Sequence, residues 1–177
     1  MFSRVMVPLD GSKVGEAAIP VILQLVDKLA AGTKVEVILI GVITLLRHWV
    51  VVGEASAPVS YTEEELKLIK ERVSDYLART GESLKKRGVT VRTLVSSGNA
   101  ADEIIKAVEE NHADLIAMST HGRSGLRKLA FGSITDKVLR RSPVPVLMVR
   151  APAGTINEYP RQSCMLSFGV MSAASTL

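Results

Sequence analysis

The stretch Met118-Ser-Thr-His-Gly122, separated by nine residues from Gly132-Ser133, decides the fold of this 177-residue chain. It follows an apolar, strand-like run over residues 114–118 and ends where a helical pattern begins at Ser133. Glycines in a strand-to-helix connection let the backbone approach a ligand closely. The following helix points its unpaired N–H groups and positive dipole end at the same place. This pattern is typical of an anion site, most often a phosphate site, and it predicts a nucleotide ligand.

Outward from this stretch, apolar segments alternate with helical patterns along the chain. The segments predicted as strands are residues 4–8, 35–42, 89–95, 114–118 and 143–149. Such alternation implies right-handed crossovers. It therefore predicts a five-stranded open parallel sheet with helices on both faces, a three-layer α/β/α fold. Because Pro145 lacks an N–H donor, the last strand is expected at an edge of the sheet, where a second subunit can pair with it.

Three helix starts are predicted from capping patterns. Thr62-Glu-Glu-Glu65 is a capping box that opens a long helix, and Asn99 caps a helix with Asp102 at its third position. Ser133-Ile-Thr-Asp136 is predicted as a further capping box. A serine cap there leaves other helix donors for a phosphate, so a capping role and a binding role coexist.

Two segments do not follow the alternation. Residues 44–61, which include Trp49, are expected to form a long loop, with or without a short extra element, that covers a ligand pocket or lies in a subunit interface. Residues 151–177 differ in composition and contain few charges. We therefore expect one domain over residues 1–150 and an appended tail over residues 151–177.

Composition argues against several classes of protein. The net charge of +4 comes from Lys and Arg interleaved with Glu, with no basic stripe carrying aromatic residues, so a nucleic-acid partner is not expected. The N-terminus lacks a signal-peptide pattern, and no apolar run reaches the ~18 residues of a membrane span. The single cysteine, Cys164, fits a cytoplasmic location and excludes an intramolecular disulfide.

If the fourth strand returns beside the first, the turn at residues 8–12 and the connection at 119–132 face each other across one crevice. Asp10 there either hydrogen-bonds a ribose or adenine edge or holds its own turn. His121, without a placed partner residue, is assigned no catalytic role. Arg123 either contacts phosphates or belongs to a solvated loop. Neither a phosphate loop with its lysine nor a G-x-G-x-x-G motif is present in the sequence.

Three motifs in order make residues 3–150 resemble the universal stress protein family. They are Val5-Met-Val-Pro-Leu-Asp10-Gly-Ser12, the segment from Met118 through Phe131-Gly-Ser133, and Pro143-Val-Pro-Val-Leu-Met-Val149. The family's ATP-binding pattern is Gly-x-x-Gly, nine residues, then Gly-Ser or Gly-Thr. Gly122, Gly132 and Ser133 match this pattern, whereas Ser119 stands where the first glycine is expected.

The resemblance implies an adenine nucleotide α-hydrolase-like or flavodoxin-like topology and a set of ligand-binding residues. Asp10 and Val42 would border the adenosine, and the segment Met118 to Gly122, with Ser119 and His121, would pass beneath the ribose and phosphates. Pro8, Leu9 and Arg123 are also expected among the binding residues. Gly132, Ser133, Ile134 and Thr135 would hold the phosphate tail of ATP or AMP, with any Mg²⁺ held through the phosphates. Family members pair through the last strand, here residues 144–149.

Three functions follow from these expectations. The leading one is a cytoplasmic homodimer that regulates the stress response through an unidentified protein partner when ATP or AMP binds. The second is a nucleotide-independent interaction module, and the third is a slow ATPase in which Asp10 and His121 are the available groups. The resemblance implies a regulator, with at most slow ATP hydrolysis.

Overall fold

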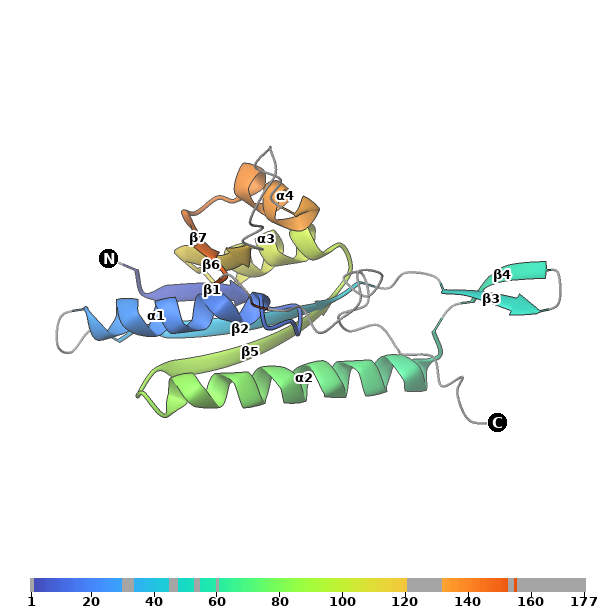
Figure 1. Ribbon diagram of the computed structural model, residues 1–177, viewed down its shortest axis with the longest axis horizontal. Coiled ribbons are helices and arrows are strands. Elements are labelled where there is room, and N and C mark those ends of the chain that lie inside the picture. The colour runs from blue at the N-terminus through green and yellow to red at the C-terminus, as the bar shows by residue number, and fades with distance from the viewer. Residues whose placement is uncertain are drawn as a thin grey trace.

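The computed structural model describes residues 2–29, 34–44, 48–52, 55–59, 61–120, 132–152 and 155 (Figure 1). The strands are β1 (Arg4–Pro8), β2 (Glu36–Ile43), β3 (His48–Val52), β4 (Ala55–Val59), β5 (Thr90–Ser97), β6 (Leu115–Thr120) and β7 (Val146–Arg150). The helices are the short 3₁₀ helix η1 (Gly15–Ala17), α1 (Ala18–Asp27), α2 (Glu63–Lys85), α3 (Ala100–Glu110) and α4 (Ser133–Arg141).

The main sheet has five parallel strands in the order β5-β2-β1-β6-β7, which confirms the predicted sheet. Strand β1 lies at its centre, pairing with β2 on one side and with β6 on the other. The order of the strands therefore reverses between β1 and β6, as expected from the sequence. In sheets of this kind, ligands bind at the carboxyl ends of the strands beside this reversal.

Helices cover both faces of the sheet, so the fold has three layers (Figure 1). Helices α1 and α2 pack on one face, where Ile22, Val73 and Leu77 join Val7 and Leu39 of the strands in one buried cluster. Helices α3 and α4 pack on the other face, together with the alternate strand residues. Because both faces are covered, the central strands are continuous apolar runs rather than alternating ones.

Two of the three predicted helix caps are confirmed. The Thr62 hydroxyl accepts a hydrogen bond from Glu65 N at 3.2 Å, and the Glu65 carboxylate accepts one from Thr62 N at 2.8 Å. Asn99 Oδ1 accepts a bond from Asp102 N at the start of α3. The predicted capping box at Ser133 is wrong, because Gly132, not Ser133, is the N-cap of α4, and no side chain of the described residues caps this helix.

The expected loop at residues 44–61 contains an antiparallel hairpin, formed by β3 and β4. The hairpin is the short extra element that the sequence analysis allowed for within this loop. The last strand lies at the edge of the sheet as predicted, but it begins at Val146 rather than at Pro143. The Ser142 hydroxyl donates to Val144 O at 2.6 Å and accepts from Val144 N at 3.2 Å, which holds a local turn before the strand.

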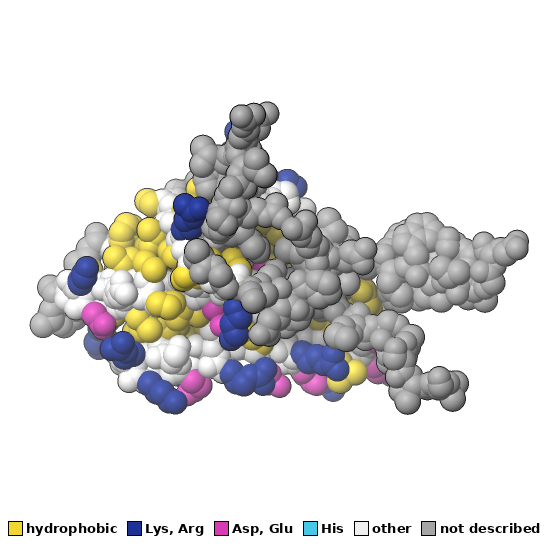
Figure 2. Space-filling model, viewed as in Figure 1, with side chains coloured by type: hydrophobic (Ala, Val, Ile, Leu, Met, Phe, Trp, Pro, Cys, Tyr) yellow, Lys and Arg dark blue, Asp and Glu magenta, His cyan; other side chains and the backbone are white. Residues whose placement is uncertain are grey.

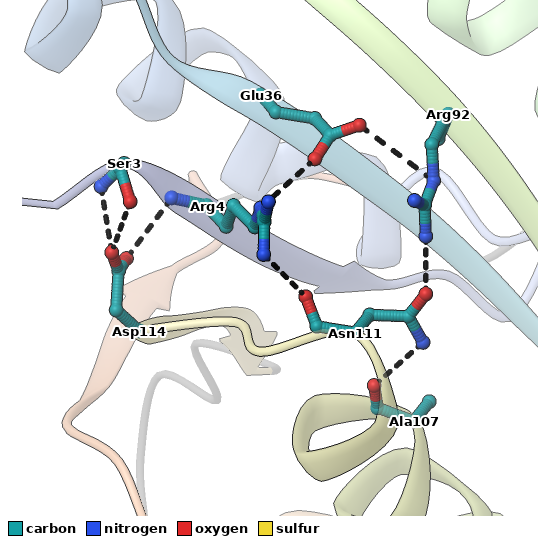
Figure 3. A network of polar contacts seen from close by, with 7 residues as sticks. All are labelled: Ser3, Arg4, Glu36, Arg92, Ala107, Asn111 and Asp114. Atoms are coloured by element: carbon teal, nitrogen blue, oxygen red, sulfur yellow. Dashed lines mark hydrogen bonds and ion pairs between the residues drawn. The ribbon is translucent and has the colours of Figure 1, made fainter.

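A polar network closes the end of the sheet opposite the carboxyl ends (Figure 3). Asp114 accepts hydrogen bonds from Ser3 N at 2.7 Å, Ser3 Oγ at 2.8 Å and Arg4 N at 3.1 Å. Glu36 lies between Arg4 at 3.3 Å and Arg92 at 3.7 Å. These contacts tie the first residues of β1, β2, β5 and β6 together.

Candidate functional site

The carboxyl ends of β1, β2 and β6 bring three predicted site segments to one edge of the sheet. Pro8 is paired with Ile40 of β2, and Leu9 N donates to Ile40 O at 2.9 Å just beyond β1. Val42 lies two residues further along β2, and Ser119 lies at the end of β6. The β1 turn and the carboxyl ends of β2 and β6 therefore lie at the same edge of the sheet, where the sequence predicted a crevice.

The turn after β1 is held by hydrogen bonds among its own residues. Asp10 Oδ1 accepts from Ser12 N at 2.9 Å and from Ser12 Oγ at 2.6 Å. The Ser12 hydroxyl oxygen in turn accepts from Gly15 N at 2.9 Å, and Gly11 has φ of 82°, which favours glycine. Asp10 thus holds its own turn, one of the two roles considered. Among the described residues, no hydrogen bond to its second oxygen, Oδ2, is seen.

Ser119 connects β6 to the segment that follows the β1 turn. Its hydroxyl is directed at two carbonyl oxygens at the start of η1, those of Val14 and of Gly15, the latter at 3.1 Å. Val14 is buried, whereas Ser119 is half-buried. The contact shows that the end of β6 and the segment after the β1 turn touch directly. It also gives the serine a structural partner, which the sequence alone did not suggest.

The first turn of α4 presents backbone rather than side-chain groups. Gly132, Ser133 and Ile134 are exposed, whereas Thr135 is buried. Asp136, expected to complete a capping box, instead pairs with Arg140 one helical turn on, at 2.9 Å. Among the residues that the structure describes, no side chain caps the helix, so none of them uses its first N–H groups as a cap.

A Cβ atom added at Gly132 would meet no described atom within 4 Å, and the φ of −54° suits any residue. Neither the described packing nor the backbone therefore requires glycine at this position. Gly15 is different, because a Cβ there would lie 2.5 Å from Asp10 Oδ1.

The remaining predicted site residues fall into three groups. The side chains of Leu9 and Met118 are buried in the two core clusters, so these residues can offer a ligand mainly their backbone. Pro8 and Val42 are half-buried at the edge of the sheet. His121, Gly122 and Arg123 lie outside the described residues.

A groove of about 790 Å³ adjoins the β1 turn on the side of α1 and α2. Gly11 and Lys13 belong to its lining, as do Tyr76 and Arg79 of α2, but Asp10 and Ser119 do not. It is therefore a neighbour of the predicted crevice rather than the crevice itself. Figure 2 shows that Lys and Arg along α2 are interleaved with Asp and Glu on this face, as expected for a solvated helix.

Tyr76 joins α2 to the same segment, and sequence reasoning missed it. Its hydroxyl donates to Glu16 Oε1 at 3.2 Å, and Lys13 Nζ contacts the other oxygen, Glu16 Oε2, at 3.0 Å. Burial raises the pKa of the Tyr76 hydroxyl, and the negative charge of Glu16 raises it further. The phenol therefore stays protonated and remains a donor at neutral pH. No spacing rule could connect residues 60 positions apart in the sequence.

Within the described ranges, no cluster of His, Cys, Asp and Glu could hold a metal ion. None of the helices described is both long and apolar enough to cross a membrane. The site described so far consists of backbone groups, one carboxylate and small hydroxyl residues at the strand-order reversal of an open parallel sheet.

Open parallel α/β sheets place their ligand sites at such a strand-order reversal. The model of the universal stress protein family matches residues 1–150, and the chain belongs to this family. The chain is 30% identical over 153 residues to universal stress protein MJ0531 of Methanocaldococcus jannaschii, covering 86% of this chain and 84% of that protein.

Solved structures agree with this assignment. The structure of protein MJ0577, also from M. jannaschii, superimposes with a TM-score of 0.61 at 25% identity over 86% of this chain and 99% of that one. An Arabidopsis thaliana family member, solved with AMP bound, has a TM-score of 0.58 at 15% identity, covering 85% of this chain and 93% of the other. A universal stress protein in complex with cAMP has a TM-score of 0.55 at 21% identity, covering 84% and 97%. The last two show the shared fold.

Proposed function

We propose that this universal stress protein binds an adenine nucleotide, AMP or ATP, in the crevice between the β1 turn and the β6 end. The observation that carries the proposal is the contact of Ser119 with the carbonyls of Val14 and Gly15, because it joins the two walls at the strand-order reversal. The AMP and cAMP complexes of proteins with the same fold support it.

The described residues fit such a ligand. Asp10 Oδ2 is an acceptor for a ribose hydroxyl or an adenine amino group, while Oδ1 is occupied by Ser12. The uncapped first turn of α4 offers N–H donors and the positive end of the helix dipole to phosphates. Gly132 leaves space for close approach, and Gly122 and Arg123 of the preceding segment would complete the phosphate contacts. Mg²⁺ would be held through the phosphates.

We further propose that the nucleotide regulates binding of a protein partner in the cytoplasm, and that the protein works as a homodimer paired through the 144–149 edge strand. The position of β7 at the sheet edge supports this pairing, because an uncovered edge offers backbone donors and acceptors to another strand. The domain would span residues 1–150, with residues 151–177 as an appended tail.

The decisive experiment is calorimetric titration of the purified chain with AMP and ATP, using Gly132→Ala as the test variant. Because the added methyl group has room in the described structure, we expect an unchanged melting temperature and at least a tenfold loss of affinity, about 1.4 kcal/mol. Lys137→Ala, on the exposed side of the same helix, is the matched control and should bind normally. Absence of binding by the parent chain at millimolar nucleotide would refute the proposal.

The alternative, a nucleotide-independent interaction module, is favoured by the uncovered edge of β7. Asp10→Ala separates the two functions. If partner binding depends on the nucleotide, the variant weakens both. If the module acts alone, nucleotide affinity falls and partner binding is unchanged.

A further inference from the structure

The β3–β4 hairpin is an extra element that the five-stranded sheet does not use. It projects beyond the carboxyl end of β2 (Figure 1), and among the described elements β3 and β4 contact mainly each other. A two-stranded ribbon alone is at best marginally stable in water, and a third strand or a packed face is needed to stabilise it. Among the described elements, none adds a third strand to the hairpin, so pairing with a further strand would stabilise it.

The register of the hairpin decides which edge a partner strand can use. Trp49 lies opposite Pro58, and Val51 lies opposite Ser56. Antiparallel pairs alternate between hydrogen-bonded and non-hydrogen-bonded kinds. Because Pro58 has no N–H group, its pair with Trp49 is a non-hydrogen-bonded pair. Since the two kinds alternate along the hairpin, the pair of Val51 with Ser56 is also non-hydrogen-bonded.

The outer backbone edge of β3 is consequently complete, with N–H and C=O groups of Trp49 and Val51 directed away from β4. The outer edge of β4 lacks a donor at Pro58. Proline on an edge strand is a known obstacle to further pairing. Strand addition is thus possible along β3 and is opposed along β4.

Neither strand contains a charged residue: β3 is His-Trp-Val-Val-Val and β4 is Ala-Ser-Ala-Pro-Val. Edge strands are usually protected by lysines or other charges, and β3 has none. Its residue types are those most favoured in strands. Charge therefore does not prevent two copies of β3 from meeting.

We propose that β3 pairs antiparallel with β3 of a second copy of this chain about a two-fold axis through Val50. Trp49 of one copy then forms a hydrogen-bonded pair with Val51 of the other, on both sides of the axis. Val50 lies opposite Val50. The product is a four-stranded sheet in the order β4-β3-β3-β4, and Pro58 on both outer strands opposes further growth. The β3–β3 contact is closed in itself by its two-fold axis.

Site-specific cross-linking tests this geometry independently of nucleotide binding and of pairing through β7. In a Cys164→Ser background, Val50→Cys places two thiols across the axis in a non-hydrogen-bonded pair, where the Cβ atoms come close enough for a disulfide. Ala57→Cys is the matched control, because Ala57 is the partner of Val50 within the hairpin but is one strand further from the axis.

Under mild oxidation we expect most Val50→Cys chains to run as a covalent dimer on a non-reducing gel, and most Ala57→Cys chains to remain single. Equal cross-linking of the two variants, or none at position 50, overturns the proposal. A second pair of variants gives an independent measurement. Val50→Lys puts like charges opposite each other and should lower the mass seen by sedimentation, whereas Ala57→Lys should not. An unchanged mass for Val50→Lys also overturns it.

Discussion

Removing the Ser119 hydroxyl is the sharpest test of how the candidate site is held together. In Ser119→Ala, the carbonyls of Val14 and Gly15 lose their donor from β6. A hydroxyl has one proton to donate, so the loss is that of one hydrogen bond shared between two acceptors. A hydrogen bond contributes about 0.5–1.5 kcal/mol net, and a buried group left without its partner costs about 1–3 kcal/mol.

Val14 is 3% exposed, but Ser119 is only half-buried, so water can replace part of what is lost. We therefore expect the free energy of unfolding to fall by about 1–2 kcal/mol, which lowers the melting temperature by about 2–8 °C for a chain of this length. Affinity for AMP should also fall, by about three- to tenfold, because the segment that follows Asp10 is no longer held to β6.

Differential scanning calorimetry with and without AMP measures both effects. Ser97→Ala is the matched control, since Ser97 is an exposed serine at the end of another parallel strand, β5. Ser119→Thr keeps the hydroxyl and should preserve stability better than alanine. If Ser119→Ala and Ser97→Ala melt at the same temperature, the reasoning about the Ser119 contact is wrong.

Three further predictions concern the helix start, the acid stability and the β1 turn. Thr62→Ala removes the capping box of α2 and should lower the free energy of unfolding in a urea titration by about 1 kcal/mol. Burial raises the pKa of Asp114, but bonds from Ser3 N, Ser3 Oγ and other backbone groups outweigh it, so the net pKa is lowered. The stability that the Asp114 carboxylate contributes is present above its unfolded pKa and is lost as the pH falls through its folded pKa. The urea midpoint of Asp114→Asn should therefore fall less on acidification than that of the parent protein. Gly15→Ala puts a methyl group against Asp10 Oδ1 and should weaken AMP binding and lower the melting temperature, unlike an alanine at an exposed helix position.

Much of the fold could be predicted from local patterns, because each strand and helix start has its own chemical signal. The capping box at Thr62 and the cap at Asn99 use side chains that bond within three residues, so sequence spacing alone identifies them. The edge position of the last strand was predicted from Pro145 and is confirmed, although Pro145 itself lies just before the strand, which begins at Val146. The same kind of reasoning was wrong at Ser133, where Gly132 is the cap and Asp136 pairs with Arg140.

The site was predictable only in part. Helix–strand alternation predicted a parallel sheet, and the assumption that its fourth strand returns beside the first placed the β1 turn beside the β6 end, as the structure has it. The sequence did not indicate that Ser119 bonds to Val14 and Gly15 or that Tyr76 bonds to Glu16, since these partners are 105, 104 and 60 residues apart. Such contacts depend on how helices and strands pack, and no local pattern records them.

By itself, the sequence determined the parallel sheet, its helices and the motifs that place the chain in its family. These follow from hydrophobic periodicity and from short-range hydrogen bonding, which act between residues close together in the chain. Only the tertiary structure decided that Asp10 uses one oxygen for its own turn, that Ser119 joins the walls of the crevice, and that β3 and β4 form a ribbon outside the main sheet. Those features result from long-range packing, in which a side chain binds whichever group the fold brings to it.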